Sequence, residues 1–370
     1  MAKRKPTEII SLVDSHHDST YPMRDRMDED HKLYRLDPYD AGDGYQSYTS
    51  NEPQVYADKI ISFLTSSELI IRIPANGNDR EQRDINNDKE RFLIGALKAA
   101  DDNLCMRMAP SVRDQLAWYT TVRGWYAGRV LLTKDDEEKT TIDVTPWDPI
   151  NTYWGESGSG LTWACYRIKK TTDEIKEQYG VKLDITTYGI DEGVYVYDFY
   201  DKEDNMVVMD DKVLKKRTKH GHNGVPIFIG MVGATPLIQS DVIGSESVSD
   251  IGESIFKANR KNYEDNNFML STMLELTARS RKQGLKVKSK DGMKTLEEDP
   301  YKEGTEIALA TGEDVEPLGM MDMAKESGAF MSMVAENFKE VLYPILFTAS
   351  LTFSCQDMQS IHLGRALNLF

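Results

Sequence analysis

Residues 249–281 read SDIGESIFKANRKNYEDNNFMLSTMLELTARSR, and this stretch decides how the rest of the chain is interpreted. Residues at intervals of three and four form one helical stripe: Ile251, Ile255, Ala258, Asn262, Asn266, Met269, Met273 and Leu276. A helix of this length reaches on the order of 45 Å, more than a small globular core covers. Because the stripe also contains asparagine, we expect helix 249–283 to pack against another long helix or against copies of itself.

A second long helix is predicted for residues 321–347. Its apolar face carries Met323, Phe330, Val334, Phe338, Val341 and Ile345, and Pro344 should kink or end it. The shared length and striping of the two helices predict a subunit interface formed by Ile251, Ile255, Met269, Met273, Phe330, Val334 and Phe338.

A short strand-and-turn module, residues 284–320, separates the two helices. Strands are predicted at 285–288 and 306–310, with turns at Asp291-Gly292 and at 311–314. The module is highly charged, and we expect it to dock partner proteins through Lys294, Glu297, Glu298 and Lys302.

An α+β domain is predicted for residues 59–248. A brief strand is expected at 70–74 and helical spacing from 85 to 132, after which the period changes to two at 142–144, 163–168 and 194–200. A short helix, Thr172 to Tyr179, has a Thr-Thr-Asp-Glu opening and a Gly180 stop. Residues 1–58 are polar and turn-rich, so we expect an arm that orders only against neighbours, with a short helix near Ile9 to Val13.

The end of the chain reads as a polar loop, 348–362, followed by the start of another helix at 363–370. This helix ends on Leu369-Phe370 with an apolar face and no cap, so we expect a chain truncated before its natural end.

Composition excludes several classes of protein. The 370 residues suggest two or more folding units, and the formal charge of −16 argues against a protein that wraps DNA tightly. The three cysteines, Cys105, Cys165 and Cys355, fit a reducing cytoplasm rather than a disulfide framework. The sequence shows neither a signal peptide nor an apolar run long enough to span a membrane.

The sequence offers only weak candidates for catalytic, phosphate-binding or metal-binding motifs. Gly155 to Gly160 resembles a phosphate loop, but Leu161 stands where the lysine is needed, so a hairpin turn is the better interpretation. His220 and His222 could ligate a metal, yet Lys215, Lys216, Arg217 and Lys219 surround them, which favours a solvated basic loop. We therefore predict a protein that is not an enzyme, with no catalytic residue, no cofactor and no metal.

Four segments resemble parts of the portal protein of tailed double-stranded DNA phages. They are YADKIISFL at 56–64, VTPWDPINTYWG at 144–155, GVPI at 224–227, and GTEIAL at 304–309 with VEPL at 315–318. Together with the order of elements, the resemblance spans about residues 56 to 370. It implies a portal-like α+β fold: a wing interrupted by a first stem helix (249–283), a clip (284–320), a second stem helix (321–347) and a tunnel loop (348–362).

What the resemblance implies is a dodecameric ring at one capsid vertex of the virion, assembled in the host cytoplasm. The ring would pass double-stranded DNA during packaging and ejection without sequence-specific binding. It would dock the large terminase subunit, the major capsid and scaffolding proteins, and the tail adaptor, with no membrane involved. Channel-loop residues would be Ser354, Gln356, Asp357 and Gln359. The alternatives are another head or tail assembly protein, such as an adaptor or scaffold, or a genome-handling enzyme.

Overall fold

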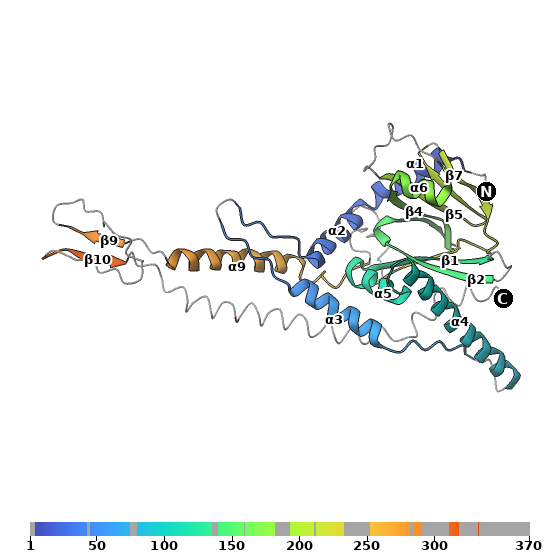
Figure 1. Ribbon diagram of the computed structural model, residues 1–370, viewed down its shortest axis with the longest axis horizontal. Coiled ribbons are helices and arrows are strands. Elements are labelled where there is room, and N and C mark those ends of the chain that lie inside the picture. The colour runs from blue at the N-terminus through green and yellow to red at the C-terminus, as the bar shows by residue number, and fades with distance from the viewer. Residues whose placement is uncertain are drawn as a thin grey trace. The chain divides into compact units, whose positions relative to one another are not determined.

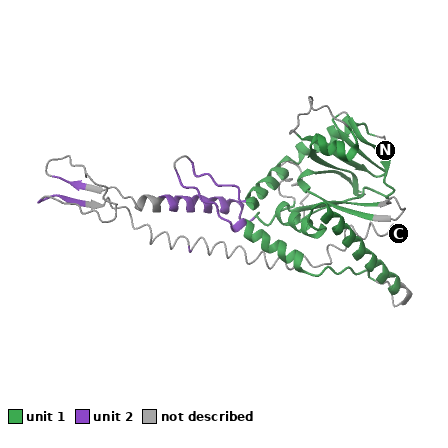
Figure 2. Cartoon of the chain, in the orientation of Figure 1, with its two compact units in different colours: residues 1–35, 54–257, 352–370 green, residues 36–53, 258–351 purple. Residues whose placement is uncertain are grey.

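The computed structural model divides the chain into two compact units (Figure 2). Unit 1 contains residues 1–35, 54–257 and 352–370, and unit 2 contains residues 36–53 and 258–351. Within them the structure describes residues 4–42, 45–74, 80–134, 140–158, 160–181, 193–210, 212–232, 252–281, 285–289, 311–317 and 332. The chain mixes helices with antiparallel sheets, which confirms the α+β class.

Two antiparallel sheets form the centre of unit 1 (Figure 1). The larger has the order β3-β4-β5-β6-β7, with bounds Thr152–Ser157, Gly160–Lys170, Val194–Asp201, Asp204–Met209 and Lys212–Lys219. The smaller has the order β2-β1-β8, with bounds Thr140–Trp147, Trp125–Lys134 and Ile227–Met231. The strands expected at 142–144, 163–168 and 194–200 are confirmed as parts of β2, β4 and β5.

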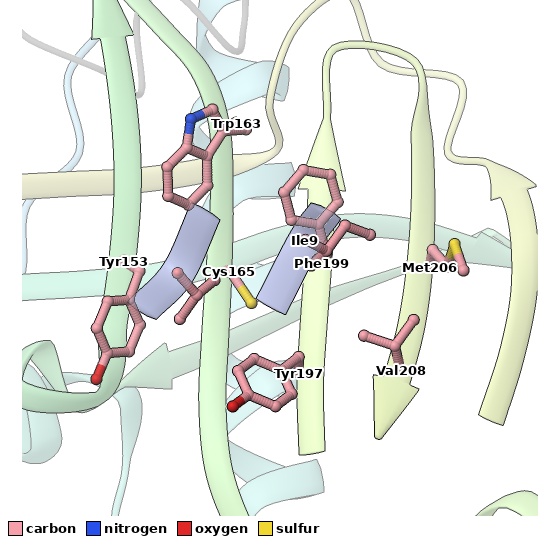
Figure 3. Packing of buried hydrophobic residues seen from close by; sticks show 9 residues of the cluster. Ile9, Tyr153, Trp163, Cys165, Tyr197, Phe199, Met206 and Val208 are labelled. Atoms are coloured by element: carbon pink, nitrogen blue, oxygen red, sulfur yellow. The ribbon is translucent and has the colours of Figure 1, made fainter. Parts of the chain in front are cut away.

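Successive side chains of β5 point to opposite faces of the larger sheet, so this strand contributes to two hydrophobic clusters. Tyr197 and Phe199 point to one face of the larger sheet and pack with Trp163 and Ile9. On the opposite face Tyr200 packs with Trp147 of the smaller sheet. Figure 3 shows the first cluster, where side chains from β3, β4, β5 and β6 converge.

The N-terminal segment is part of this core, so the prediction of an arm over residues 1–58 that orders only against neighbours is wrong. Helices α1 (Pro6–Ser19) and α2 (Tyr21–Arg35) bury Ile9 and Val13, and Met23 and Met27, respectively. Each pair is spaced by four residues and lies on one helix face. The polar composition hid these helices because α2 also buries charged residues, which find partners only in the folded chain.

Helices α3 (Glu52–Ser66), α4 (Arg80–Met106) and α5 (Val112–Trp118) precede the smaller sheet. Leu104 of α4 and Val112 of α5 pack with Val144 of β2. The helical pattern expected up to residue 132 ends earlier, because a π-helix at 119–123 is followed by Gly124 in the left-handed region and by β1. The strand expected at 70–74 is also wrong: this segment pairs with no described strand, and instead the Ile73 N–H donates to the Glu90 carboxylate and the Pro74 carbonyl oxygen accepts from Asn86, both in α4.

Helix α6 (Thr172–Tyr179) has the predicted bounds. The hydroxyl of Thr171 accepts a hydrogen bond from the Glu174 N–H, and Gly180 ends the helix with φ +68°. Among the described residues, no helix has both the length and the hydropathy that crossing a bilayer requires.

Unit 2 contains a long helix and a two-stranded sheet. Helix α9 spans Arg260–Arg281, and strands β9 (Leu285–Lys288) and β10 (Asp314–Pro317) pair antiparallel. The helix expected from 249 thus begins at Arg260, because residues 255–259 form turns. Strand β9 and the turn at 311–312 agree with the predicted module. The strand expected at 306–310, the tunnel loop at 348–362, the helix start at 363–370 and, apart from helical Ser332, the second stem helix lie outside the described residues.

Candidate functional site

The segment that precedes α9, residues 252–256, belongs to unit 1 and is held within it by hydrogen bonds and an ion pair. Arg26 of α2 donates a hydrogen bond to the carbonyl oxygen of Gly252 at 2.7 Å and forms a 3.2 Å ion pair with Glu253. The hydroxyl of Ser254 donates to the carboxylate of Asp30 at 2.7 Å. We call residues 252–256 the stem root, since they lead directly into the turn before α9. Their polar side chains explain why the helix does not begin at 249: these residues are held by α2 instead.

The backbone of the stem root is bonded to the chain around Gly124. The Glu253 N–H donates to the carbonyl oxygen of Val232 at 2.9 Å, and the Ile255 N–H donates to that of Thr121 at 3.1 Å. Thr121 lies in the π-helix, an element that often marks functional positions within helices. A Cβ atom on Gly124 would lie 2.4 Å from the Glu253 carbonyl carbon, so only glycine allows this approach.

Two buried arginines of this region, Arg24 and Arg123, donate hydrogen bonds to backbone carbonyl oxygens of other segments. Arg24 donates to the carbonyl oxygens of Ile150 and Thr152, the latter at 2.8 Å. Burial lowers the pKa of Arg24 to about 10, so it stays protonated at neutral pH. Arg123 donates to the Met27 carbonyl oxygen at 2.7 Å and to Asp148 at 3.0 Å. Helix α2 is therefore joined to the start of β3 by its own Arg24 and to the π-helix by Arg123, and its Arg26 and Asp30 contact the stem root.

The predicted interface residues are only partly within the described chain. Ile255, Met269 and Met273 are half-buried in the single subunit. Ile251, Phe330, Val334 and Phe338 lie outside the described residues. On α9 the buried side chains include Tyr263, Asn266 and Ser271, whereas Phe268 is 58% exposed. The sequence stripe mixed two faces of the helix, and whether its members form a subunit interface stays a prediction.

A loop of unit 2 follows the polar side of α9 (Figure 2). The N–H groups of Ser50, Tyr48 and Gln46 donate to Asn267, Ser271 and Glu275, with distances of 2.8, 2.9 and 3.4 Å. Two residues of an extended chain rise about 6.6 Å and four residues of a helix about 6.0 Å, so the two spacings nearly match over three bonds. Sequence reasoning missed this contact. The available signal was the spacing of Asn267, Ser271 and Glu275 by four residues.

The module after α9 is closed by its two strands. Lys288 lies opposite Asp314 and Leu285 opposite Pro317, and the Lys288 ammonium is 3.8 Å from the Asp314 carboxylate. The predicted docking residues Lys294, Glu297, Glu298 and Lys302 fall between β9 and β10 in sequence but outside the described residues. The predicted channel residues Ser354, Gln356, Asp357 and Gln359 also lie outside them.

The histidine pair is built into the fold. Nε2 of His220 lies 2.9 Å from the carbonyl oxygen of Asp201, and its Nδ1 accepts from the His222 N–H at 3.2 Å. Nε2 of His222 accepts from the Leu132 N–H at 3.4 Å. These contacts favour a structural role for both rings. Within the described ranges, no group of three or more His, Cys, Asp or Glu side chains is arranged to hold a metal ion.

The buried titratable groups are engaged between the sheets. Arg129 is 2.6 Å from the Asp143 carboxylate and 3.3 Å from that of Asp198, while the Tyr200 hydroxyl is 3.1 Å from its guanidinium. Burial raises the pKa of Asp198. Burial also raises the pKa of the Cys165 thiol, which makes it a poor nucleophile. The contacts of Arg129 with Asp143, Asp198 and Tyr200 compensate the burial of these charges.

The described fold and site define an α+β protein with an antiparallel two-sheet unit and a second unit of a long helix and a hairpin. The chain matches no protein-family model, and no curated protein matches it either.

Proposed function

We propose that this protein is a portal-type subunit, which assembles with copies of itself into a ring at one vertex of a phage capsid. The ring is a channel for double-stranded DNA during packaging and ejection. In this proposal, unit 1 is the wing, α9 is the first stem helix, and β9 with β10 forms the base of the clip. The clip docks the large terminase subunit and later the tail adaptor, and the wing meets capsid and scaffolding proteins.

The observation that carries the proposal is the pairing of β9 with β10. The register from Lys288 opposite Asp314 to Leu285 opposite Pro317 brings the two ends of the segment 289–313 together, and Leu285 follows the last residue of α9 by four positions in sequence. A long helix followed by such a closed excursion is the arrangement that a stem and clip require. An antiparallel pair also keeps the ends of the charged excursion together, so that it can act as one docking element.

The charge of the chain supports a channel. A formal charge of −16 gives little tendency to bind phosphate groups, because binding to DNA depends on clustered cations that release counterions. A wall that repels the DNA backbone lets it slide. The bonds between the stem root and α2 support the proposal as well, because a subunit under packaging force needs a firm connection into its helix.

Negative-stain electron microscopy and light scattering of the purified full chain test the proposal. We expect closed rings with a central hole and a single narrow mass. A protein that stays monomeric or dimeric at micromolar concentration would contradict it. Nucleotide hydrolysis or metal-dependent DNA cleavage by the purified protein would favour the alternative of a genome-handling enzyme, and a protein that binds preformed rings without making its own would be an adaptor.

A further inference from the structure

The loop of residues 37–51 has the composition of a binding surface. It contains Tyr39, Tyr45 and Tyr48 among serine, glycine and aspartate, and no Lys or Arg occurs between Arg35 and Lys59. Tyrosine supplies a large amphipathic contact area at low conformational cost, and small polar residues adapt to the partner. Tyr45 is 57% exposed and Tyr48 is 39% exposed, so both rings are accessible to a partner.

The described parts of the loop, residues 37–42 and 45–51, are held by hydrogen bonds to side chains rather than by pairing in a sheet. Besides the three bonds to α9, the Tyr39 N–H donates to the Thr49 hydroxyl at 2.9 Å and the Ala41 N–H to the Ser47 hydroxyl at 3.0 Å. These bonds pair the outgoing and returning arms of the loop. A loop that is ordered before binding loses little entropy when a partner arrives. The loop is therefore pre-organised as well as exposed.

Another face of α9 is exposed and carries a large apolar side chain. Lys261, Asp265, Phe268 and Thr272 are spaced by four and three residues, so they lie on one side of the helix, and all four are exposed. Phe268 is 58% exposed at the middle of this face. Basic residues, Arg260 and Lys261, begin the helix. This face offers an aromatic group and a cationic end, which complement the tyrosines and aspartates of the loop.

We infer that the loop 37–51 of one copy docks on the face Lys261–Thr272 of α9 in the neighbouring copy. The inference rests on the proposed ring and names the contact that closes it. The contact joins two different surface patches, one on each of two copies of the chain. Such heterologous contacts generate closed rings. In this arrangement the ring axis runs parallel to α9, so that equivalent residues of neighbouring copies lie at the same height. Tyr48, bonded to Ser271, therefore meets the neighbouring copy at the level of Phe268 and Thr272.

Cross-linking of mixed single-cysteine variants tests the contact. Tyr48→Cys and Phe268→Cys are introduced separately into a chain in which Cys105 and Cys355 are replaced by serine, so that the added cysteine accompanies only Cys165, which is fully buried. Rings are treated with a short bis-maleimide. We expect covalent dimers only from rings in which the two variants are co-expressed. Rings of Tyr48→Cys alone or of Phe268→Cys alone should give none. Dimers from either variant alone, or intact mixed rings that do not cross-link, would overturn the inference.

Ring stability provides a second test that needs no cysteine. The double variant Tyr45→Ala/Tyr48→Ala should shift the protein concentration for half-dissociation of rings upward by tenfold or more. Tyr21→Ala is the matched control, since Tyr21 is 56% exposed on α2, and it should leave that concentration unchanged. Equal behaviour of the two variants would overturn the inference but leave the ring proposal standing. If the unmodified chain forms no ring, the proposed function fails first and the inference falls with it.

Discussion

Arg26 and Glu253 lie 227 residues apart in sequence and form an ion pair of 3.2 Å in which each side chain is only 7% exposed. The pair joins α2, near the start of the chain, to the stem root, which leads into α9. A buried ion pair of this kind contributes little net stability, but it is costly to break because one charge is then left without compensation. Its main effect is to fix the position of the stem root relative to α2 within unit 1.

Arg26→Met should therefore lower the free energy of unfolding of unit 1 by up to roughly 3 to 5 kcal/mol, because it removes the buried guanidinium from the Glu253 carboxylate and leaves it the half-exposed Lys257 ammonium at 3.5 Å. The double variant Arg26→Met/Glu253→Leu should recover most of the loss. Tryptophan fluorescence during urea unfolding measures both, since all five tryptophans lie in unit 1. An equal loss in the single and double variants would show that the hydrogen bond from Arg26 to Gly252, rather than the charge, is what matters.

Gly124→Ala and Gly180→Ala form a matched pair. Both glycines have left-handed backbone conformations, with φ of +71° and +68°. A Cβ on Gly180 meets nothing within 4 Å, so this variant should lose about 1 kcal/mol from backbone strain alone. A Cβ on Gly124 meets the backbone of Glu253 and Ser254, so that variant should lose about 2 to 4 kcal/mol. Similar losses in the two variants would mean that the stem root can shift without cost.

His16 should make unit 1 less stable in mild acid. Its ring packs against Trp154 at 4.8 Å and against Tyr153 and Trp163, and burial with Arg24 nearby lowers its pKa from 6.5 to about 4. Between these two values the unfolded chain binds a proton that the folded chain does not, so stability falls as the pH falls from 6.5 toward 4.

The variant His16→Gln should remove this dependence. We expect the difference in unfolding free energy between the unmodified chain and the variant to change by on the order of 2 kcal/mol between pH 7 and pH 4.5. Urea unfolding at a series of pH values measures it. Parallel pH curves for the two proteins would show that His16 becomes protonated in the folded chain without penalty.

The segment between β9 and β10 is the part of the chain to which the proposal assigns partner docking. Replacing residues 291–303 with a short Gly-Ser turn retains β9 and β10, and we expect rings of normal size that do not package DNA. An alanine variant at Lys294, Glu297, Glu298 and Lys302, which keeps the length, separates the charge of the loop from its reach. Normal packaging by rings of the shortened variant would contradict a docking role for this segment.

Local sequence patterns predicted those helices and strands that are stabilised by residues within or next to the element itself. Helix α6 was predicted to its bounds because the Thr-Thr-Asp-Glu opening and Gly180 supply its caps within the element itself. The β5 strand was predicted because its residues alternate between two faces, and that period belongs to the strand rather than to its neighbours. The coarse α+β class follows from the same kind of information.

The tertiary structure decided the elements whose stability depends on distant residues. Residues 252–256 have a helical pattern, yet Arg26, Asp30 and Thr121 take their polar groups, so α9 begins at Arg260. Helix α2 is polar in composition, and it is buried only because strand ends and the stem root provide partners for its charges. The loop along α9 likewise exists because the side chains of one segment satisfy the backbone of another. Periodicity reports what one segment prefers by itself, whereas a buried polar group can be placed only when its partner is known.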